Sequence, residues 1–93
     1  DYSKLHFVIG FVNDKDLSSI VELFPKNANY YFCKPNISRG LDAVDLKILF
    51  ESKHRFGNSY SSVAEALNSA KNNSKVTDLI YIGGSTFVVA EII

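Results

Sequence analysis

Three short polar segments, each placed directly after an apolar run, carry the side chains that could do chemistry. In the first, Asp14-Lys15-Asp16, the lysine could hold a phosphate near a helix N-terminus while the carboxylates orient it or a substrate amine. In the second, Arg39 offers a planar guanidinium that can bind a carboxylate through two hydrogen bonds. In the third, Gly83-Gly84-Ser85, the glycines permit close approach of a ligand that the serine hydroxyl can contact.

Each of these segments also has a plainer interpretation. The lysine and its carboxylates could be solvated charges at a capped helix start, Arg39 a surface residue, and Ser85 a helix cap alone. The chain lacks the G-x-x-x-x-G-K-S/T phosphate loop, the G-x-G-x-x-G dinucleotide motif and the G-x-S-x-G nucleophile motif. His6, His54 and Cys33 are predicted to be structural. We therefore expect the three segments to form part of a site that another domain completes.

Two hydrophobic periods alternate along the chain and define the elements that must position these side chains. Continuous and β-branched apolar runs predict strands, whereas apolar residues three and four apart predict one-faced helices. The predicted strands are 6–11, 30–33, a short segment at Tyr60, and 79–82. The predicted helices are 17–24, 42–54 and 62–70.

Local signals fix several of the helix ends. Asp42 is a suitable N-cap for the second helix, which the pair Gly57-Asn58 is expected to end. Ser62 and Glu65 form a capping box at the start of the third helix. The segment 86–93 is ambiguous, because its β-branched residues favour a strand while its apolar spacing fits a helix. We favour a helix there, since strands and helices alternate up to that point.

Alternating strands and helices predict an α/β fold, a Rossmann-like three-layer sandwich with a mostly parallel sheet and helices on both faces. The run at 6–11 is the most apolar, so it should be central. The expected strand order is Tyr60, 30–33, 6–11, 79–82. Ligands of such sheets gather at the carboxyl ends of the strands. The three polar segments are therefore predicted to meet at this edge.

Length and composition restrict the class of protein. Ninety-three residues predict a single domain, 1–93, and 46% hydrophobic residues are enough for a core. Ten basic and ten acidic residues give a net charge of zero, which argues against a nucleic-acid partner. No apolar run approaches the roughly 20 residues of a membrane span. The single cysteine, Cys33, predicts a cytoplasmic location because it excludes an internal disulfide.

In order and spacing, the sequence resembles the C-terminal domain of the folylpolyglutamate synthase and dihydrofolate synthase family, in the Mur ligase superfamily. The matching residues are Phe7-Val8-Ile9-Gly10, Asp14-Lys15-Asp16, Ser38-Arg39-Gly40-Leu41, Ser62 to Leu67 with Ala70, Asp78, Gly84-Ser85 and Glu91. The family often has proline where this chain has Ser38, and glycine where it has Ala90. The resemblance covers nearly the whole chain and implies that it is one domain of a larger, three-domain enzyme.

The resemblance implies an ATP-dependent ligase that adds L-glutamate to a folate or dihydropteroate through an acyl phosphate. ATP and Mg²⁺ would be bound mainly by the central domain, and the chain's partners would be its own N-terminal and central domains. By position, Lys15 would face the phosphates as the catalytic cation, flanked by Asp14 and Asp16, while Arg39 and Ser85 would contact the glutamate. We expect a monomer with no membrane partner, and no activity from the 93 residues alone.

Two alternatives of another class stay open at this stage. One is a non-catalytic, Rossmann-like ligand-binding module, such as a receiver-like signalling domain. That module needs an acceptor aspartate after its third strand, and none follows Tyr60 directly. The other is an oligomerisation module, which would carry a self-complementary apolar patch rather than polar segments at the strand ends.

Overall fold

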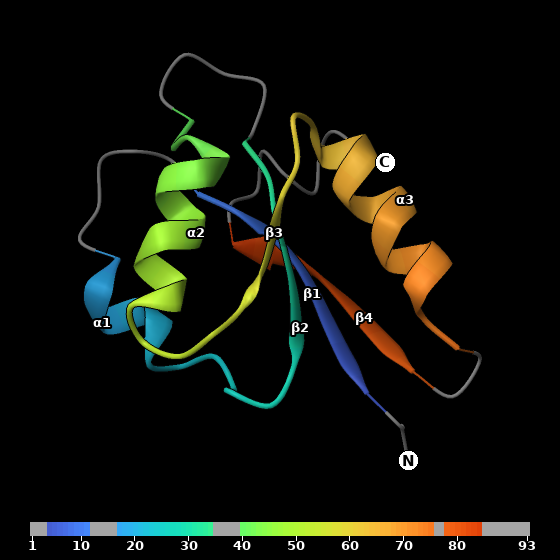
Figure 1. The fold of residues 1–93 in the computed structure, drawn as a ribbon, viewed down its shortest axis with the longest axis horizontal. Helices are drawn as coiled ribbons and strands as arrows, with labels where there is room; N and C mark the ends of the chain where they lie inside the picture. The colour runs from blue at the N-terminus through green and yellow to red at the C-terminus, as the bar shows by residue number, and fades with distance from the viewer. Residues whose placement is uncertain (1–3, 12–16, 35–39, 76–77, 85–93) are drawn as a thin grey trace.

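The computed structural model describes residues 4–11, 17–34, 40–75 and 78–84. Four parallel strands form one sheet, with α1 and α2 on one face and α3 on the other (Figure 1). The elements are β1 (Leu5–Gly10), α1 (Ser18–Val21), β2 (Asn29–Phe32), α2 (Ala43–Glu51), β3 (Gly57–Ser59), α3 (Val63–Asn73) and β4 (Leu79–Gly84). The strand order is β3-β2-β1-β4, so the predicted fold class and strand order are confirmed.

The face covered by α1 and α2 holds the larger core. Phe7 of β1 stacks on Tyr30 of β2, with ring centroids 5.2 Å apart. Phe50 of α2 packs on the rings of Tyr30 and Phe32, at 5.6 and 5.2 Å. These aromatic side chains alternate with residues of the opposite face, as the twofold period of a strand requires.

Among the described elements, α3 is the one that covers the opposite face. Val8 and Tyr31 face this helix, which presents Val63, Ala66 and Ala70 to the sheet. The two alanines are small, so the helix axis can lie close to the strands. Ser62 caps the helix as predicted, its hydroxyl accepting the Glu65 N–H at 3.1 Å. The Glu65 carboxylate accepts the Ser61 N–H at 3.3 Å, one residue before the partner that a capping box predicts.

The first helix is shorter than its apolar spacing predicts. It covers Ser18–Val21, whereas the apolar pattern runs from 17 to 24. The N–H groups of Leu23 and Phe24 bond carbonyls three residues back, at 2.9 and 3.0 Å, which is the pattern of a tightened final turn. Pro25 follows and has no N–H to donate, so the helix cannot continue. No helix in the described ranges is long and apolar enough to cross a membrane.

The predicted end of α2 is wrong. The helix ends at Glu51, and the turn after it closes on His54, which has a φ of 65°. The His54 N–H bonds the Glu51 carbonyl at 3.1 Å, and the Arg55 N–H bonds the Phe50 carbonyl at 3.0 Å. This pair of bonds is a Schellman motif, whose left-handed position is usually glycine. Because histidine fills that position here, the end of the helix carries no glycine signal, and Gly57 belongs to β3 instead.

Replacing His54 by glycine should stabilise the protein. Histidine in the left-handed region is strained, whereas glycine is not, and the flexibility of glycine in the unfolded chain offsets only part of the gain. We expect His54→Gly to raise the free energy of unfolding by about 0.5–1 kcal/mol in urea titrations. His54→Ala is the control, because it keeps the strain. A glycine variant no more stable than the alanine variant would contradict this account.

Gly57 instead allows β3 to lie close against β2. A Cβ built at Gly57 would lie 2.0 Å from the carbonyl oxygen of Tyr30, because β3 lies directly against β2. The clash is with backbone and cannot be relieved without moving the strand. At Gly83 the added Cβ would meet the ring of Tyr81 at 2.8 Å. That ring is 51% exposed and has room to turn aside.

The two glycines should therefore differ in their tolerance of alanine. Gly57→Ala should lower the free energy of unfolding by at least about 1–3 kcal/mol, the usual cost of overpacking. Gly83→Ala should cost clearly less, since only a half-exposed side chain has to move. Urea denaturation of the two variants beside the unchanged chain measures both effects. Equal losses in the two variants would show that the backbone clash at β3 is not decisive.

Candidate functional site

The carboxyl ends of the parallel strands form the edge where the sequence predicts a site. β1 and β4 end together, because Gly10 pairs with Gly84 in the strand register. β2 ends alongside them, with Phe32 paired with Ile9. Two glycines at adjacent strand ends leave the backbone without side-chain cover. This edge can therefore admit close approach by a ligand.

Hydrogen bonds tie together the chain segments that leave this edge. The Cys33 N–H bonds the Ile9 carbonyl at 3.0 Å, just beyond the end of β2. The Leu41 N–H bonds the Phe11 carbonyl at 2.8 Å. The Asp42 carboxylate accepts the Val44 N–H at 3.2 Å and starts α2 beside the same edge. The described residues that flank the first two polar segments are thus in direct contact.

The predicted site residues lie outside the described part of the chain. They are Asp14, Lys15, Asp16, Arg39 and Ser85. The predicted helix at 86–93 also lies outside it. The structure describes the residues that adjoin them in the chain, Leu17, Gly40 and Gly84. The hydrogen bond from Leu41 to Phe11 joins residues that flank the first two polar segments. The roles of the five residues stay predictions.

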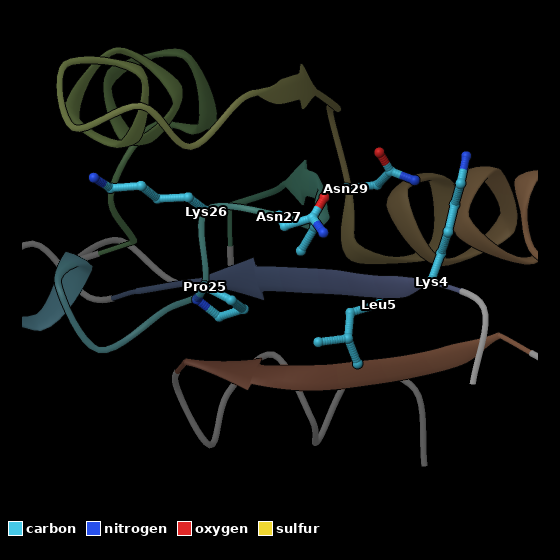
Figure 2. Close-up of a pocket in the computed structure, with 7 residues that line it drawn as sticks. Lys4, Leu5, Pro25, Lys26, Asn27 and Asn29 are labelled. Atoms are coloured by element: carbon cyan, nitrogen blue, oxygen red, sulfur yellow. The ribbon is translucent and has the colours of Figure 1, made fainter. Parts of the chain in front are cut away.

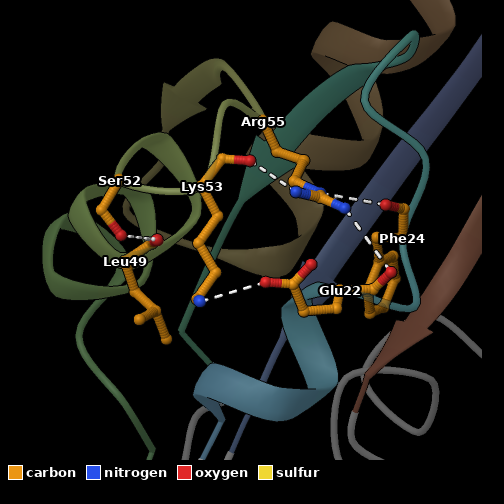
Figure 3. Close-up of polar contacts among 6 residues, drawn as sticks. All are labelled: Glu22, Phe24, Leu49, Ser52, Lys53 and Arg55. Carbon is orange, nitrogen blue, oxygen red and sulfur yellow. Dashed lines mark hydrogen bonds and ion pairs between the residues drawn. The ribbon is translucent and has the colours of Figure 1, made fainter.

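Arg55 is a buried cation that the sequence did not single out. Its side chain holds the turns after α1 and α2 together, as Figure 3 shows. Nε donates to the Phe24 carbonyl at 3.0 Å, Nη1 to the Lys53 carbonyl at 2.5 Å and Nη2 to the Glu22 carbonyl at 3.5 Å. Arg55 is 4% exposed, and its guanidinium donates to these three carbonyls. It is therefore not available to a ligand. Nearby, a hydrogen bond from Lys53 lowers the pKa of Glu22.

A second buried polar cluster joins three strands at the amino end of the sheet. His6 Nε2 lies 2.8 Å from Asp78 Oδ2, and His6 Nδ1 lies 3.0 Å from the Tyr31 hydroxyl. The His6 and Asp78 side chains are 0% and 2% exposed. When Nε2–H donates to Asp78 Oδ2, Nδ1 can accept the Tyr31 hydroxyl proton, so both ring nitrogens have partners. The other carboxylate oxygen, Asp78 Oδ1, is buried and has no hydrogen-bond partner among the described residues. The predicted structural role of His6 agrees with this geometry.

The surroundings shift the pKa values of two of these groups. The hydrogen bond from His6, with a further bond from the Lys75 N–H, lowers the pKa of Asp78. Burial raises the pKa of Tyr31 and keeps its phenol protonated. Position sets the cluster apart from the candidate site, since His6 and Asp78 lie at the amino ends of β1 and β4 and the site lies at their carboxyl ends.

The lowered pKa of Asp78 should appear in the stability of the protein at acid pH. A carboxyl with a depressed pKa in the folded state stabilises above its unfolded pKa, and that contribution is lost as pH falls through the folded pKa. The loss for Asp78 begins near its ordinary value of 3.8. The difference in unfolding free energy between the unchanged chain and Asp78→Asn should therefore shrink as pH falls below that value. A difference that stays constant from pH 7 to pH 2 would contradict this.

Two cavities lie at the amino edge of the sheet, away from the candidate site. The larger, of about 410 Å³, is lined by the start of β1 and the segment before β2 (Figure 2). Lys4 and Asn29 project to one side of it, while Lys26 points away, so the cations do not converge. Asn29 and Lys4 also line a neighbouring cavity of about 280 Å³. Among the described residues, no group of three histidine, cysteine or acidic side chains could hold a metal ion.

The parallel sheet, the helices on both faces and the glycines at adjacent strand ends define a Rossmann-like α/β domain whose ligand edge is the carboxyl edge. No protein-family model matches the sequence. A probable bifunctional folylpolyglutamate synthase/dihydropteroate synthase of Haloferax volcanii is 37% identical over 92 residues. The protein with the same description in Halobacterium salinarum is 33% identical over 95 residues. Each match covers 98% of this chain and 11% of the relative.

Solved structures agree with these relatives. The structure of E. coli FolC in complex with DHPP and ADP superposes with a TM-score of 0.87 and 26% identity, over 99% of this chain and 22% of that one. The bifunctional folylpolyglutamate synthase/dihydrofolate synthase of Yersinia pestis, complexed with AMPPNP and Mn, shares the fold with a TM-score of 0.80 and 21% identity, over 96% of this chain and 21% of that one. The chain is thus similar in sequence to proteins described as folylpolyglutamate synthases, and similar in fold to part of FolC. It spans about a ninth of the length of the curated relatives.

Proposed function

We propose that this chain is the C-terminal domain of a three-domain, ATP-dependent ligase that adds L-glutamate to a folate or dihydropteroate. The observation that carries the proposal is the relationship to folylpolyglutamate synthases over nearly the whole chain, at 37% identity in one relative. The described geometry supports it, because the strand ends bring the segments that flank the predicted site to one edge. The relatives' names also include dihydropteroate synthase, an activity that we do not assign to these residues.

In the proposed reaction, the terminal carboxylate of the acceptor takes the γ-phosphoryl group of ATP. The amine of glutamate then attacks the acyl phosphate, an amide bond forms and phosphate leaves. Lys15 would offset the charge on the phosphates, with Asp14 and Asp16 orienting it. Arg39 would bind a carboxylate of glutamate through its two-pronged guanidinium, and the Ser85 hydroxyl would add a hydrogen bond.

Such a site must hold several negatively charged groups close together. Two carboxylate substrates and a nucleotide triphosphate repel one another, so fixed cationic donors must offset that repulsion as the transition state forms. Positioning the amine against the acyl phosphate supplies a further part of the rate. Exclusion of water is also needed, because water would hydrolyse the acyl phosphate, and the closing of a mobile domain over the substrates is a common solution.

ATP and a divalent ion, Mg²⁺, would be held mainly by the central domain. The ion would neutralise phosphate charge when bound. The chain's partners would then be its own N-terminal and central domains, and the 93 residues alone should not turn over. The related structures are complexes with ADP, or with AMPPNP and Mn, which supports a nucleotide and a divalent ion as cofactors of the full-length enzyme.

Single substitutions in the full-length enzyme test the proposal. Lys15→Ala should lower kcat on the order of 100- to 1,000-fold, as removal of one donor to a developing charge costs roughly 2.7–4 kcal/mol. Arg39→Ala and Ser85→Ala should instead raise the KM for glutamate, and Arg39→Lys should restore it only in part. ADP release in the presence of glutamate and the acceptor measures all four. Lys71→Ala, an exposed lysine of α3, is the matched control.

A kcat for Lys15→Ala within twofold of the unchanged enzyme would make Lys15 a surface cation. A KM for glutamate that is unchanged in both Arg39→Ala and Ser85→Ala would remove the glutamate site from this edge. Both results together would favour the non-catalytic module. Circular dichroism of each variant shows whether its fold is intact.

A further inference from the structure

The two outermost strands of the described sheet, β3 and β4, differ in kind. β3 is three residues long and carries only small or polar side chains, as the outermost strands of native sheets often do. β4 pairs with β1 along all six of its residues and contains no charged residue or proline. It therefore lacks the features that usually keep an open strand from pairing with another segment.

The backbone of β4 presents a row of hydrogen-bonding groups on its outer side, the side that faces away from β1. The Leu79 N–H bonds the Lys4 carbonyl at 3.0 Å, so the backbone groups of Leu79 point toward β1. Along a strand of a parallel pair, every second residue points the same way, which turns the N–H and carbonyl groups of Ile80, Ile82 and Gly84 outward. None of the described strands lies there to pair with them. The outer side of β4 is thus a template for a further strand.

The side chains of β4 are also incompletely covered on one face of the sheet. Tyr81 lies on the face of the aromatic core, where its ring is 5.4 Å from that of Phe7, and Leu79 lies on the same face. The side chains of Leu79 and Tyr81 are nevertheless 53% and 51% exposed. The helix α2 packs on β2 and β3, away from β4 (Figure 1). Because strands of a parallel sheet are normally covered on both faces, this exposure indicates a neighbour that the described residues do not supply.

A segment of the same polypeptide fits the outer side of β4 better than a second copy of the chain. Stable interfaces between proteins bury about 800 Å² on each partner. A fully buried aromatic side chain contributes only about 150–250 Å², so one strand with two half-exposed side chains falls well short. A segment of the same polypeptide needs less contact, because the linking chain gives it a high effective concentration. This chain spans about a ninth of its curated relatives, which leaves many further segments in an enzyme of that length.

We propose that the outer side of β4 is the interface for a further strand, supplied by a segment of the full-length enzyme outside residues 1–93. Its backbone pairs with the outward groups of Ile80 and Ile82 and so extends the sheet beyond β4. The added strand is apolar and uncharged, because the β4 side chains beside it are apolar on both faces. The inference rests on the proposed function only for the existence of a longer enzyme, and not for its reaction or substrates.

Hydrogen exchange of the β4 amides tests the interface without reference to catalysis. If the outer side is unpaired, the slow amides of β4 are those that point toward β1, on Leu79, Tyr81 and Gly83. If a further strand is present, the outward amides of Ile80 and Ile82 also exchange more slowly, by about tenfold or more. Mass spectrometry of peptides that span β4 counts the slow amides in the full-length enzyme and in the 93-residue chain. We expect the outward amides to be slow in the full-length enzyme and fast in the 93-residue chain.

Photo-cross-linking in the full-length enzyme identifies the segment, even if the 93-residue chain does not fold alone. Benzoylphenylalanine in place of Leu79 can be accommodated, because that side chain is half exposed. Mass spectrometry should then find it joined to a peptide from outside residues 1–93. The same group in place of Leu23, which is 82% exposed at the end of α1, is the matched control and should not react with that peptide.

Three results would overturn the inference. Fast outward amides in the full-length enzyme would leave the outer side of β4 without a strand. Slow outward amides already in the 93-residue chain would assign the pairing to the chain itself or to a second copy. A cross-link from position 79 to residues 85–93, or to another molecule, would do the same. Slow outward amides in an enzyme that adds no glutamate would overturn the proposed function and leave this interface supported.

Discussion

The whole domain depends on β1 being paired with a parallel strand on each side. Val8 and Ile9 are fully buried, one facing α3 and the other facing the aromatic core, so β1 can exist only inside a covered sheet. Parallel pairs need long connections, and these become the helices that cover the two faces. The layers, the strand order and the position of every connection therefore follow from this one strand. Its loss would leave β2 and β4 without a common neighbour.

The same pairing explains why chemistry is expected at one edge. In a parallel sheet all carboxyl ends face the same way, so polar segments distant in the chain are brought to neighbouring places. The hydrogen bond between Leu41 and Phe11 shows this for residues that flank the first two segments, and the pairing of Gly10 with Gly84 shows it for described residues next to the first and third. The opposite edge holds Asp78 and other groups that fix strands. The predicted site and the buried His6–Asp78 pair therefore lie toward opposite ends of the strands.

Periodic and local features of the fold could be predicted from the sequence, whereas single contacts between distant residues could not. The strands, their order and the helix starts at Asp42 and Ser62 follow from apolar spacing and capping, which are local properties. The turn that closes α2 is predicted at Gly57-Asn58 but lies at His54, because a residue other than glycine fills the left-handed position. The contacts of Arg55 and His6 also could not be predicted from the sequence, because they join residues far apart in the chain. The five candidate site residues were chosen from chemistry and resemblance, and the structure describes only their neighbours.

The order of the strands has a consequence for the way the chain folds. β1 and β2 are near neighbours along the chain and can meet early, but β1 must wait for β4, which stands near the other end of the sequence. Closing so large a loop is entropically costly before any contact repays it, so non-local parallel pairing slows folding. Until β4 arrives, one side of the β1 backbone is an open strand edge, a site where another unfolded chain can pair. The strand that is most buried in the native sheet is therefore the one most able to pair with another chain during folding.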